Sequence, residues 1–168
     1  TFAGAGVAFM GSSPANLQRL KNHLGVMSIG PDKVNQLRHV KFLTEHTTLT
    51  EHMARHAAVM QPRFNAVLDT LEKQLGDTGM GHWTNPAGGY FISFDSLPGL
   101  AREIISLAAQ AGVKLTPAGA TFPYSNDPDD SNIRIAPTFP SVEDIQQAVD
   151  VFVLCVKLAS VNQAIDKQ

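Results

Sequence analysis

The chain has 168 residues, of which 43% are hydrophobic and 17% are charged. A chain of this length can bury a substantial apolar core, so we expect one domain, or one domain and part of a second. Thirteen Lys and Arg residues against fifteen Asp and Glu residues give a formal net charge of −2. Because nucleic-acid binding requires a basic patch or stripe, which this sequence lacks, we expect no nucleic-acid partner.

Apolar runs and cysteines are both scarce. The longest apolar run, residues 151–156, is far shorter than the ~20 residues of a membrane-spanning helix, so we expect no membrane segment. Cys155 is the single cysteine and cannot form an intramolecular disulfide, which points to a reducing compartment. The chain starts at Thr1 with neither a Met nor a signal-peptide pattern, as a piece of a longer protein would.

The N-terminal residues predict a strand and then helices. Residues 7–12 are apolar and flanked by glycine and serine, a pattern typical of a buried strand. Ser13 and Pro14 then form a helix start, for a helix that ends at Gly25. A second helix is expected to begin at residues 30–32 and to end near residue 43.

The longest periodic segment follows. After a pause at residues 47–50, apolar residues recur every three or four positions as far as Leu75, which predicts a long helix with one packed face. Pro62 lies in its middle, where it removes a backbone donor and clashes with the preceding turn. We therefore expect a kink at residues 59–61, and a kinked helix of this kind is a natural domain boundary.

The remaining residues predict short strands that alternate with helices. The strands are expected at residues 90–94, 113–115 and 133–135. Helices are expected at residues 98–110 and from residue 141 onwards. Residues 76–89 and 118–131 have the composition of loops. Alternation of strands and helices predicts an α/β or α+β fold.

Three patterns could suggest reactive or metal-binding side chains. His52 and His56 share one helix face, as some zinc ligands do, but no third ligand accompanies them, so we expect two solvated histidines. Cys155 has no charged neighbour to stabilise a thiolate, which predicts a buried, unreactive side chain. The acidic residues of 127–130 lack the glycine and the glutamate of a calcium loop, so we expect a solvated turn and no metal.

Arg134 is the strongest candidate for a functional residue. It lies at the centre of a short expected strand, between Ile133 and Ile135, whose side chains must point to the opposite face. An arginine in this position either pairs with a structural carboxylate or faces a site that binds an anion. Its planar guanidinium, with five donors, suits the carboxylate of a substrate.

Four short motifs occur in a characteristic order: TFAGAGVAF at residues 1–9, GGYF at 88–91, AGVKLTPAG at 111–119 and NIRIAP at 132–137. Together they resemble the C-terminal part of a class I/II aminotransferase of fold-type I, which depends on pyridoxal phosphate. The first motif resembles the stretch just after the Schiff-base lysine, and the last resembles the strand with the arginine that binds the substrate α-carboxylate. Residues 30–36 resemble an aspartate-aminotransferase-like bacterial subgroup.

The resemblance implies a fold and an organisation into domains. It implies an α/β protein in which residues 1–47 are the end of a large cofactor-binding domain. Residues 48–168 would be a long kinked linker helix and a small C-terminal α/β domain.

The resemblance also implies roles for individual residues. Arg134 would bind the substrate α-carboxylate, and Tyr90 and Phe91 would lie near the substrate side chain. Gly4 and Gly6 would lie beside the cofactor, where glycine lets the backbone approach a ligand closely. No catalytic residue and no metal ligand is implied within this sequence.

The implied activity is transfer of an amino group between an aspartate-like amino acid and a 2-oxo acid, with pyridoxal 5'-phosphate as cofactor, by a cytoplasmic homodimer. The Schiff-base lysine would fall just before Thr1, and none of the seven lysines occupies its motif. We therefore expect this chain to be inactive by itself, since that lysine anchors the cofactor and moves the proton. The arginine that many relatives use for the cofactor phosphate is also missing near Gly6.

Three alternatives remain open from the sequence. The first is a lyase or decarboxylase that uses the same cofactor and fold. The second is a non-catalytic effector-binding domain of an aminotransferase-like regulator. The third is a structural α/β module in which Arg134 pairs with an internal carboxylate.

Overall fold

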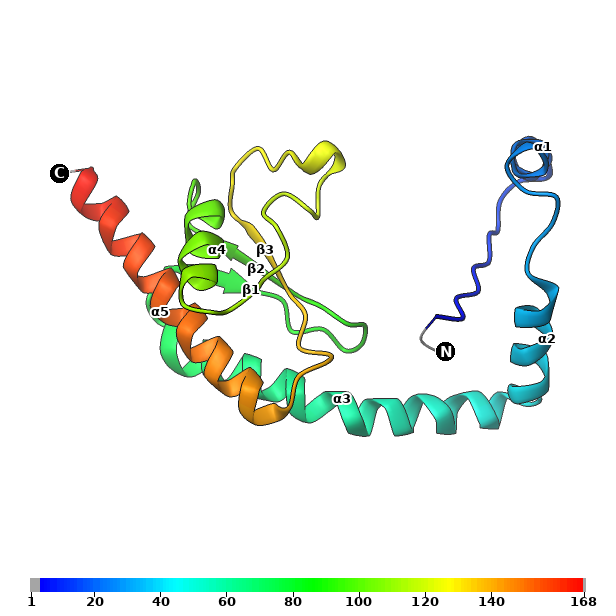
Figure 1. Cartoon of the computed structure of the whole chain (residues 1–168), viewed down its shortest axis with the longest axis horizontal. Helices are drawn as coiled ribbons and strands as arrows, with labels where there is room; N and C mark the ends of the chain where they lie inside the picture. Colours follow the sequence, from blue (N-terminus) through cyan, green and yellow to red (C-terminus); the bar gives the residue numbers. More distant parts are fainter. Residues whose placement is uncertain (1–3, 168) are drawn as a thin grey trace. The chain divides into compact units, whose positions relative to one another are not determined.

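The computed structural model describes residues 4–167, except for the side chain of His46. Its elements, drawn in Figure 1, are α1 (Pro14–Met27), α2 (Lys33–Phe42), α3 (His46–Leu75), β1 (Gly81–Trp83), β2 (Ile92–Ser96), α4 (Ala101–Gln110), the 3-10 helix η1 (Pro123–Ser125), β3 (Asn132–Ile135) and α5 (Val142–Asp166). The chain divides into two compact units, Thr1–Ala57 and Ala58–Gln168, and α3 runs through the boundary between them. The domain boundary that we expect near residue 47 stays a prediction.

The first two helices begin where the sequence predicts. The Ser13 hydroxyl accepts a hydrogen bond from the Asn16 amide at 3.3 Å, and Pro14 occupies the first turn of α1. The Asp32 carboxylate accepts one from the Asn35 amide at 2.9 Å at the start of α2. Each cap joins a side chain to the backbone amide three residues later, so the local sequence is sufficient to place both caps. At its other end α1 extends two residues beyond Gly25.

Neither α1 nor α2 contains a buried residue. Large apolar side chains in this unit, such as Ile29, Val34 and Val40, are largely exposed. In the described part of the first unit, Ala5 is the one buried hydrophobic residue. Its helices therefore have almost no core of their own to stabilise them.

The strand expected at residues 7–12 is wrong, because these residues form no regular structure. A strand needs a neighbour for its backbone N–H and C=O groups. The described residues form one sheet, and residues 7–12 are not part of it. The apolar pattern shows that a segment could be buried, but it carries no information about a partner strand.

The long helix α3 is continuous from His46 to Leu75, with Pro62 inside it. Residues 47–50, expected as a pause, are helical. Threonine is a weak helix former but not a helix breaker, so a strong apolar period further along can include it. The kink expected at residues 59–61 stays a prediction.

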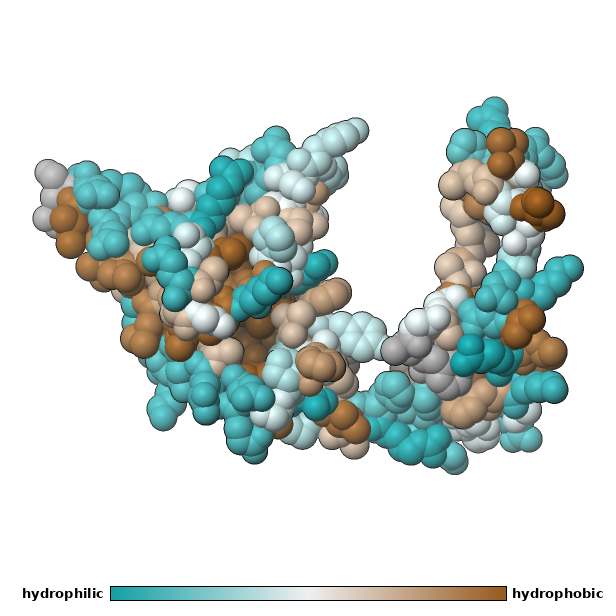
Figure 2. All heavy atoms as spheres, viewed as in Figure 1, coloured by the Kyte–Doolittle hydropathy of each residue, from teal (hydrophilic) through white to brown (hydrophobic). Residues whose placement is uncertain are grey.

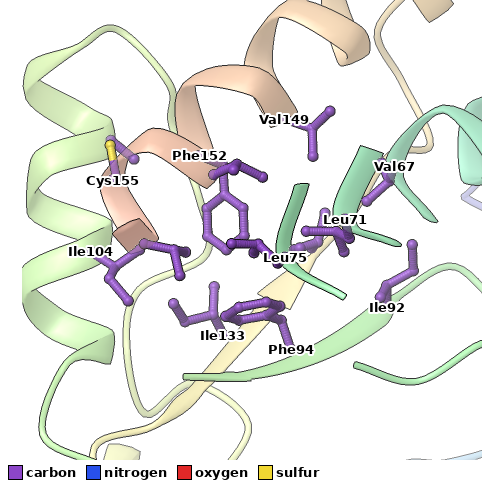
Figure 3. Close-up of a cluster of buried hydrophobic side chains, with 14 of the residues drawn as sticks. Val67, Leu71, Leu75, Ile92, Phe94, Ile104, Ile133, Val149, Phe152 and Cys155 are labelled. Atoms are coloured by element: carbon purple, nitrogen blue, oxygen red, sulfur yellow. The ribbon is translucent and has the colours of Figure 1, made fainter. Parts of the chain in front are cut away.

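The second unit is built on a three-stranded antiparallel sheet with the order β1-β2-β3. Alternate residues of β2 and β3 are buried, with Ile92 and Phe94 of β2 beside Ile133 and Ile135 of β3. Side chains from α3, α4 and α5 complete this core, as Figure 3 shows. The Phe94 ring meets the Phe152 ring edge to face, with 5.1 Å between centroids. The mixed α/β class predicted from the sequence is confirmed.

The strands themselves are predicted only in part. The expected strands at residues 90–94 and 133–135 correspond to β2 and β3. The expected strand at residues 113–115 is wrong. Val113 packs against the core, but its amide bonds to the carbonyl of Ala108 at the end of α4. The loop expected at residues 76–89 contains β1, which the sequence analysis missed.

The last helix, α5, begins at the predicted cap, where the Ser141 hydroxyl accepts from the Asp144 amide at 3.1 Å. By length and composition alone it could cross a membrane, contrary to the expectation from residues 151–156. Core helices meet the same criterion, and Phe152 and Val156 belong to the core of the second unit. Other apolar side chains of α5 lie on the surface (Figure 2).

Candidate functional site

Within residues 4–167, the Arg134 side chain has no hydrogen-bond acceptor. Arg134 is paired with Ser93 across β2 and β3, on the sheet face opposite to the buried Ile133 and Ile135. Its Nε atom is buried and makes no hydrogen bond, and the ion pairs of the described chain do not include it. A buried donor without an acceptor carries a desolvation cost of about 1–3 kcal/mol. A ligand with a hydrogen-bond acceptor would remove this cost by bonding to Nε.

The ring of Phe91 supports this guanidinium. The Cζ atom of Arg134 lies 4.4 Å from the ring centroid, which is cation–π distance. Phe91 and Tyr90 are both about half exposed. Gly89, with φ = 94°, adopts the left-handed conformation just before them, which glycine allows at little cost. The GGYF motif therefore forms a turn that brings Phe91 to Arg134.

A cavity of about 170 Å³ lies beside β3 in the second unit. It is lined by Arg134, by residues 113–116, by Pro137 and Pro140, and by apolar side chains of α3 and α5. Arg134 and Lys114 are among its lining residues, and no Asp or Glu is. A cavity with cations and no carboxylate favours an anionic ligand.

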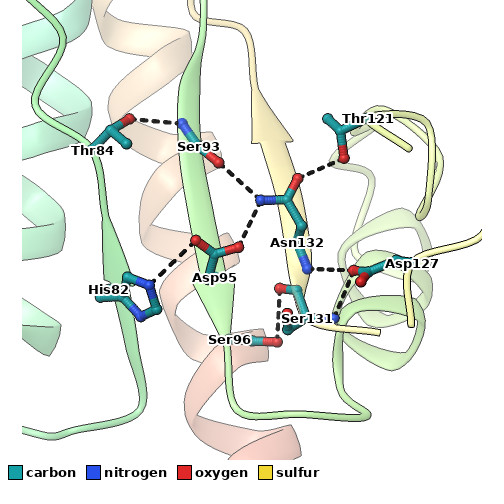
Figure 4. Close-up of polar contacts among 9 residues, drawn as sticks. All are labelled: His82, Thr84, Ser93, Asp95, Ser96, Thr121, Asp127, Ser131 and Asn132. Atoms are coloured by element: carbon teal, nitrogen blue, oxygen red, sulfur yellow. Dashed lines mark hydrogen bonds and ion pairs between the residues drawn. The ribbon is translucent and has the colours of Figure 1, made fainter. Parts of the chain in front are cut away.

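A polar network fixes the strand that carries Arg134 (Figure 4). Asn132 lies two residues before Arg134 and on the same face of β3. Its Nδ2 atom donates to Ser93 Oγ at 2.8 Å and to Asp95 Oδ1 at 2.6 Å, and its Oδ1 accepts from Thr121 Oγ1 at 2.7 Å. One side chain thus joins β2, β3 and the loop that precedes β3.

Asp127 anchors the same loop, and the solvated turn expected here is wrong for this residue, which is buried. Its carboxylate accepts hydrogen bonds from the amides of Asp129, Ser131 and Asn132 at 3.2, 2.9 and 2.8 Å. Burial alone would raise the pKa of Asp127, but the amide donors outweigh it and hold the pKa below its ordinary value. Within residues 4–167 no group of three or more His, Cys, Asp or Glu residues could hold a metal ion.

The other reactive candidates have ordinary environments. Cys155 is buried in the core, as predicted, and burial raises the pKa of its thiol, so the unreactive neutral form is favoured. The His52 and His56 rings pack against each other with centroids 4.3 Å apart, and Phe42 meets His52 edge to face. His52 is half-buried and His56 is exposed.

Gly4 and Gly6 are exposed, and a Cβ atom at either would meet nothing within 4 Å. The Gly6 carbonyl accepts a hydrogen bond from Asn35 Nδ2 at 3.1 Å. A ligand could therefore approach this backbone closely, as a cofactor neighbour requires. The two glycines bring no charged group to a phosphate, however, so they fit the edge of a cofactor site rather than a complete one.

The whole chain, residues 1–168, matches the family model described as aspartate amino-transferase. This chain belongs to that family, which confirms the aminotransferase resemblance carried by the four motifs. A putative aminotransferase of Mycolicibacterium smegmatis is 48% identical over 160 residues, which is 95% of this chain. An aspartate aminotransferase of Corynebacterium glutamicum is 44% identical over the same share. The chain spans 37% of the length of each of these curated relatives.

Solved structures agree with this assignment. The crystal structure of an aspartate transaminase from Corynebacterium glutamicum superposes with a TM-score of 0.82 at 41% identity, over 90% of this chain and 36% of that chain. A putative aminotransferase from Corynebacterium diphtheriae gives 0.81 at 44% identity, over 90% and 37%. At 22% identity, an α-aminoadipate aminotransferase from Thermus thermophilus, crystallised with N-(5'-phosphopyridoxyl)-L-leucine, shares the fold with a TM-score of 0.71, over 89% and 37%.

The structure brings Arg134 and Phe91 together, and Gly4 and Gly6 belong to the other unit. The roles of these residues in binding stay predictions. The four motifs imply no role for Asn132. The strand period of two, which puts Asn132 on the face of Arg134, is the signal that could have found it.

Proposed function

We propose that this chain is the C-terminal part of an aminotransferase that transfers an amino group between an aspartate-like amino acid and a 2-oxo acid. Membership of the family and the names of the relatives support the reaction class. The observation that carries the proposal is the Arg134 guanidinium, which lies on Phe91 and has a buried Nε without an acceptor. A substrate α-carboxylate would supply that acceptor.

The protein's own contribution at this site is binding and orientation. Arg134 would hold the α-carboxylate through two parallel N–H···O bonds, which fix the plane of the substrate as well as its position. Phe91 keeps the guanidinium in place, and Tyr90 beside it would contact the substrate side chain. The lining of the adjacent cavity includes Arg134 and Lys114 and no carboxylate, so its charges would favour an anionic substrate over a neutral molecule of similar size.

Pyridoxal 5'-phosphate, when bound, would supply the electron sink that the reaction needs. In this chain, the backbone of Gly4 and Gly6 would lie beside the cofactor. The Schiff-base lysine and the groups that hold the cofactor phosphate would come from other parts of the full-length protein.

The remaining organisation is part of the same proposal. Residues 1–47 would complete a large cofactor domain, which the exposed apolar side chains of α1 and α2 support, since they need a cover. Residues 48–168 would form the linker helix and small domain, with α3 kinked at Pro62 as the hinge. The full-length protein would be a homodimer in the cytoplasm, as the resemblance to the family implies.

The test uses the full-length protein with Arg134→Ala, and Arg102→Ala as the matched control. Arg102 is largely exposed, and its Nε atom lies 3.7 Å from Asp130 Oδ1. We expect Arg134→Ala to weaken amino-acid and 2-oxo-acid binding by about 2 kcal/mol, roughly thirtyfold, because a charge-assisted contact is lost. The control should bind like the wild type.

Product analysis of the same samples separates the alternatives. An aminotransferase moves the amino group onto the 2-oxo acid, whereas a lyase or decarboxylase releases a fragment of the amino acid. A non-catalytic effector-binding domain would bind without turnover. Unchanged affinity in Arg134→Ala would overturn the role given to Arg134.

A further inference from the structure

A second arginine, Arg63 of α3, bonds to a residue that lines the cavity. Arg63 is half-buried, and its Nε atom donates to the Pro140 carbonyl at 2.9 Å. Its Nη1 atom donates to the Val59 carbonyl, one turn earlier on the same helix, at 3.2 Å. The described ion pairs do not include Arg63. Its guanidinium therefore bonds to two backbone carbonyls in different elements.

The helix at this point is weakened by its own sequence. Pro62 has no N–H, so the carbonyl of Ala58 loses the donor that an α-helix normally provides. Arg63 follows directly, and its Nη1 atom donates to the Val59 carbonyl in this turn. The same turn is where α3 enters the second unit, which begins at Ala58.

The carbonyl that Arg63 holds belongs to the connection between β3 and α5. Pro140 and Pro137 both line the Arg134 cavity, and Val67, one turn after Arg63 on α3, lines it as well. Among the hydrogen bonds of the described residues, the bond from Arg63 is the one that attaches residues 136–140 to another element. This wall of the cavity is thus attached to α3 by Arg63.

We propose that Arg63 is a positioning residue for carboxylate binding: it holds the Pro140 carbonyl and so fixes the cavity wall beside Arg134. The inference rests on the proposed function, because it assumes that the cavity receives the substrate. Arg63 acts through the connection and does not contact the substrate. Its loss would lower affinity for the substrate in the ground state and the transition state alike, which raises KM and spares kcat.

The experiment compares Arg63→Ala, Arg63→Lys and Arg102→Ala in the full-length, cofactor-loaded protein. We expect Arg63→Ala to raise the KM for the amino acid about tenfold while kcat stays within about twofold. Arg63→Lys keeps the charge and one donor, so its KM should be intermediate. Binding of the unreactive dicarboxylate maleate, measured by calorimetry, should weaken in the same order. Arg102→Ala should match the wild type in all three measurements.

The outcomes separate this inference from the proposed function. If Arg134→Ala weakens maleate binding but Arg63→Ala matches Arg102→Ala, the role of Arg63 is overturned and the role of Arg134 stands. If Arg134→Ala also binds maleate normally, the proposed carboxylate site fails. Should circular dichroism show Arg63→Ala unfolded, Arg63→Lys decides, and a wild-type KM in that variant contradicts the inference.

Discussion

At the scale of single residues, most polar groups of the site are hydrogen-bonded to one another, and the side chain of Arg134 is the exception among the described residues. Asn132 and Asp127 make hydrogen bonds to neighbouring groups, whereas the buried Nε of Arg134 has no partner in the described part of the chain. The contrast is informative, because buried polar groups in folded proteins are almost always hydrogen-bonded. The satisfied groups hold the strand and the loop, and the unsatisfied one is left for a ligand.

Asp127 gives a prediction for stability in acid. Its pKa is lower in the folded chain than its usual value near 3.8, so its contribution is present above that value and is lost as the pH falls through the folded pKa. Asp127→Asn should lower the free energy of unfolding at neutral pH by about 2 kcal/mol, because bonds to a charged group are lost. As the pH falls below about 4, the unfolding free energy of the Asp127→Asn variant should decrease less than that of the wild type.

Urea titrations between pH 2.5 and 7 would measure both effects. Asp129→Asn is the matched control, because that carboxylate is exposed. Equal unfolding free energies for Asp127→Asn and Asp129→Asn at neutral pH would show that the amide bonds to Asp127 do not stabilise the loop.

At the scale of elements, the sequence predicts the features that depend on neighbouring residues. The starts of α1, α2 and α5 depend on the side chains of Ser13, Asp32 and Ser141, each of which caps an amide three residues away. The alternation of residues 133–135 likewise places Arg134 on the open face of β3. These predictions succeed because the interactions that decide them lie within a few residues of one another.

The failures concern interactions between distant residues. Residues 7–12 have the composition of a strand, but they pair with no strand of the described sheet. The composition of β1 is that of a loop, yet β1 pairs with β2. The network around Asn132 spans up to 39 positions of sequence, from Ser93 to β3. Such pairs depend on the assembled fold, which periodicity and propensity do not report.

The missed strand β1 depends on a glycine. A Cβ atom at Gly81 would contact the ring of Phe94 and lie 3.0 Å from the Asp95 carbonyl. Phe94 has no exposed area, and the Trp83 ring stacks parallel to it, so the ring has no room to move. Gly81→Ala should therefore destabilise the second unit by about 1–3 kcal/mol through overpacking.

Thermal unfolding followed by circular dichroism would measure this effect. Gly88→Ala serves as the control, since a Cβ atom there meets nothing within 4 Å and the residue has no positive φ. Similar melting temperatures for Gly81→Ala and Gly88→Ala would contradict the close contact between β1 and Phe94.

At the scale of the whole molecule, the two units differ in how well each is stabilised. The second unit has a continuous core built from three helices and the sheet, whereas α1 and α2 bury none of their residues. Segments with few buried contacts open at low free-energy cost. The two units should therefore differ in local stability when this 168-residue chain is studied by itself.

Limited proteolysis of the 168-residue chain tests this difference. We expect the first cuts at residues 4–45 and a resistant fragment that contains the sheet, α4 and α5, identified by mass spectrometry. In the full-length protein, the same N-terminal sites should be protected if a large domain covers them. First cuts within α4 or α5 would contradict the assignment of the core.

The central claim is that Arg134 receives the carboxylate of the substrate. A crystal structure of the full-length protein with maleate tests it most directly. We predict a carboxylate paired with the Arg134 guanidinium through two N–H···O contacts of about 2.7–2.9 Å, with the Phe91 ring still against the guanidinium. A maleate bound elsewhere, with Arg134 paired to a carboxylate of the protein itself, would contradict the account.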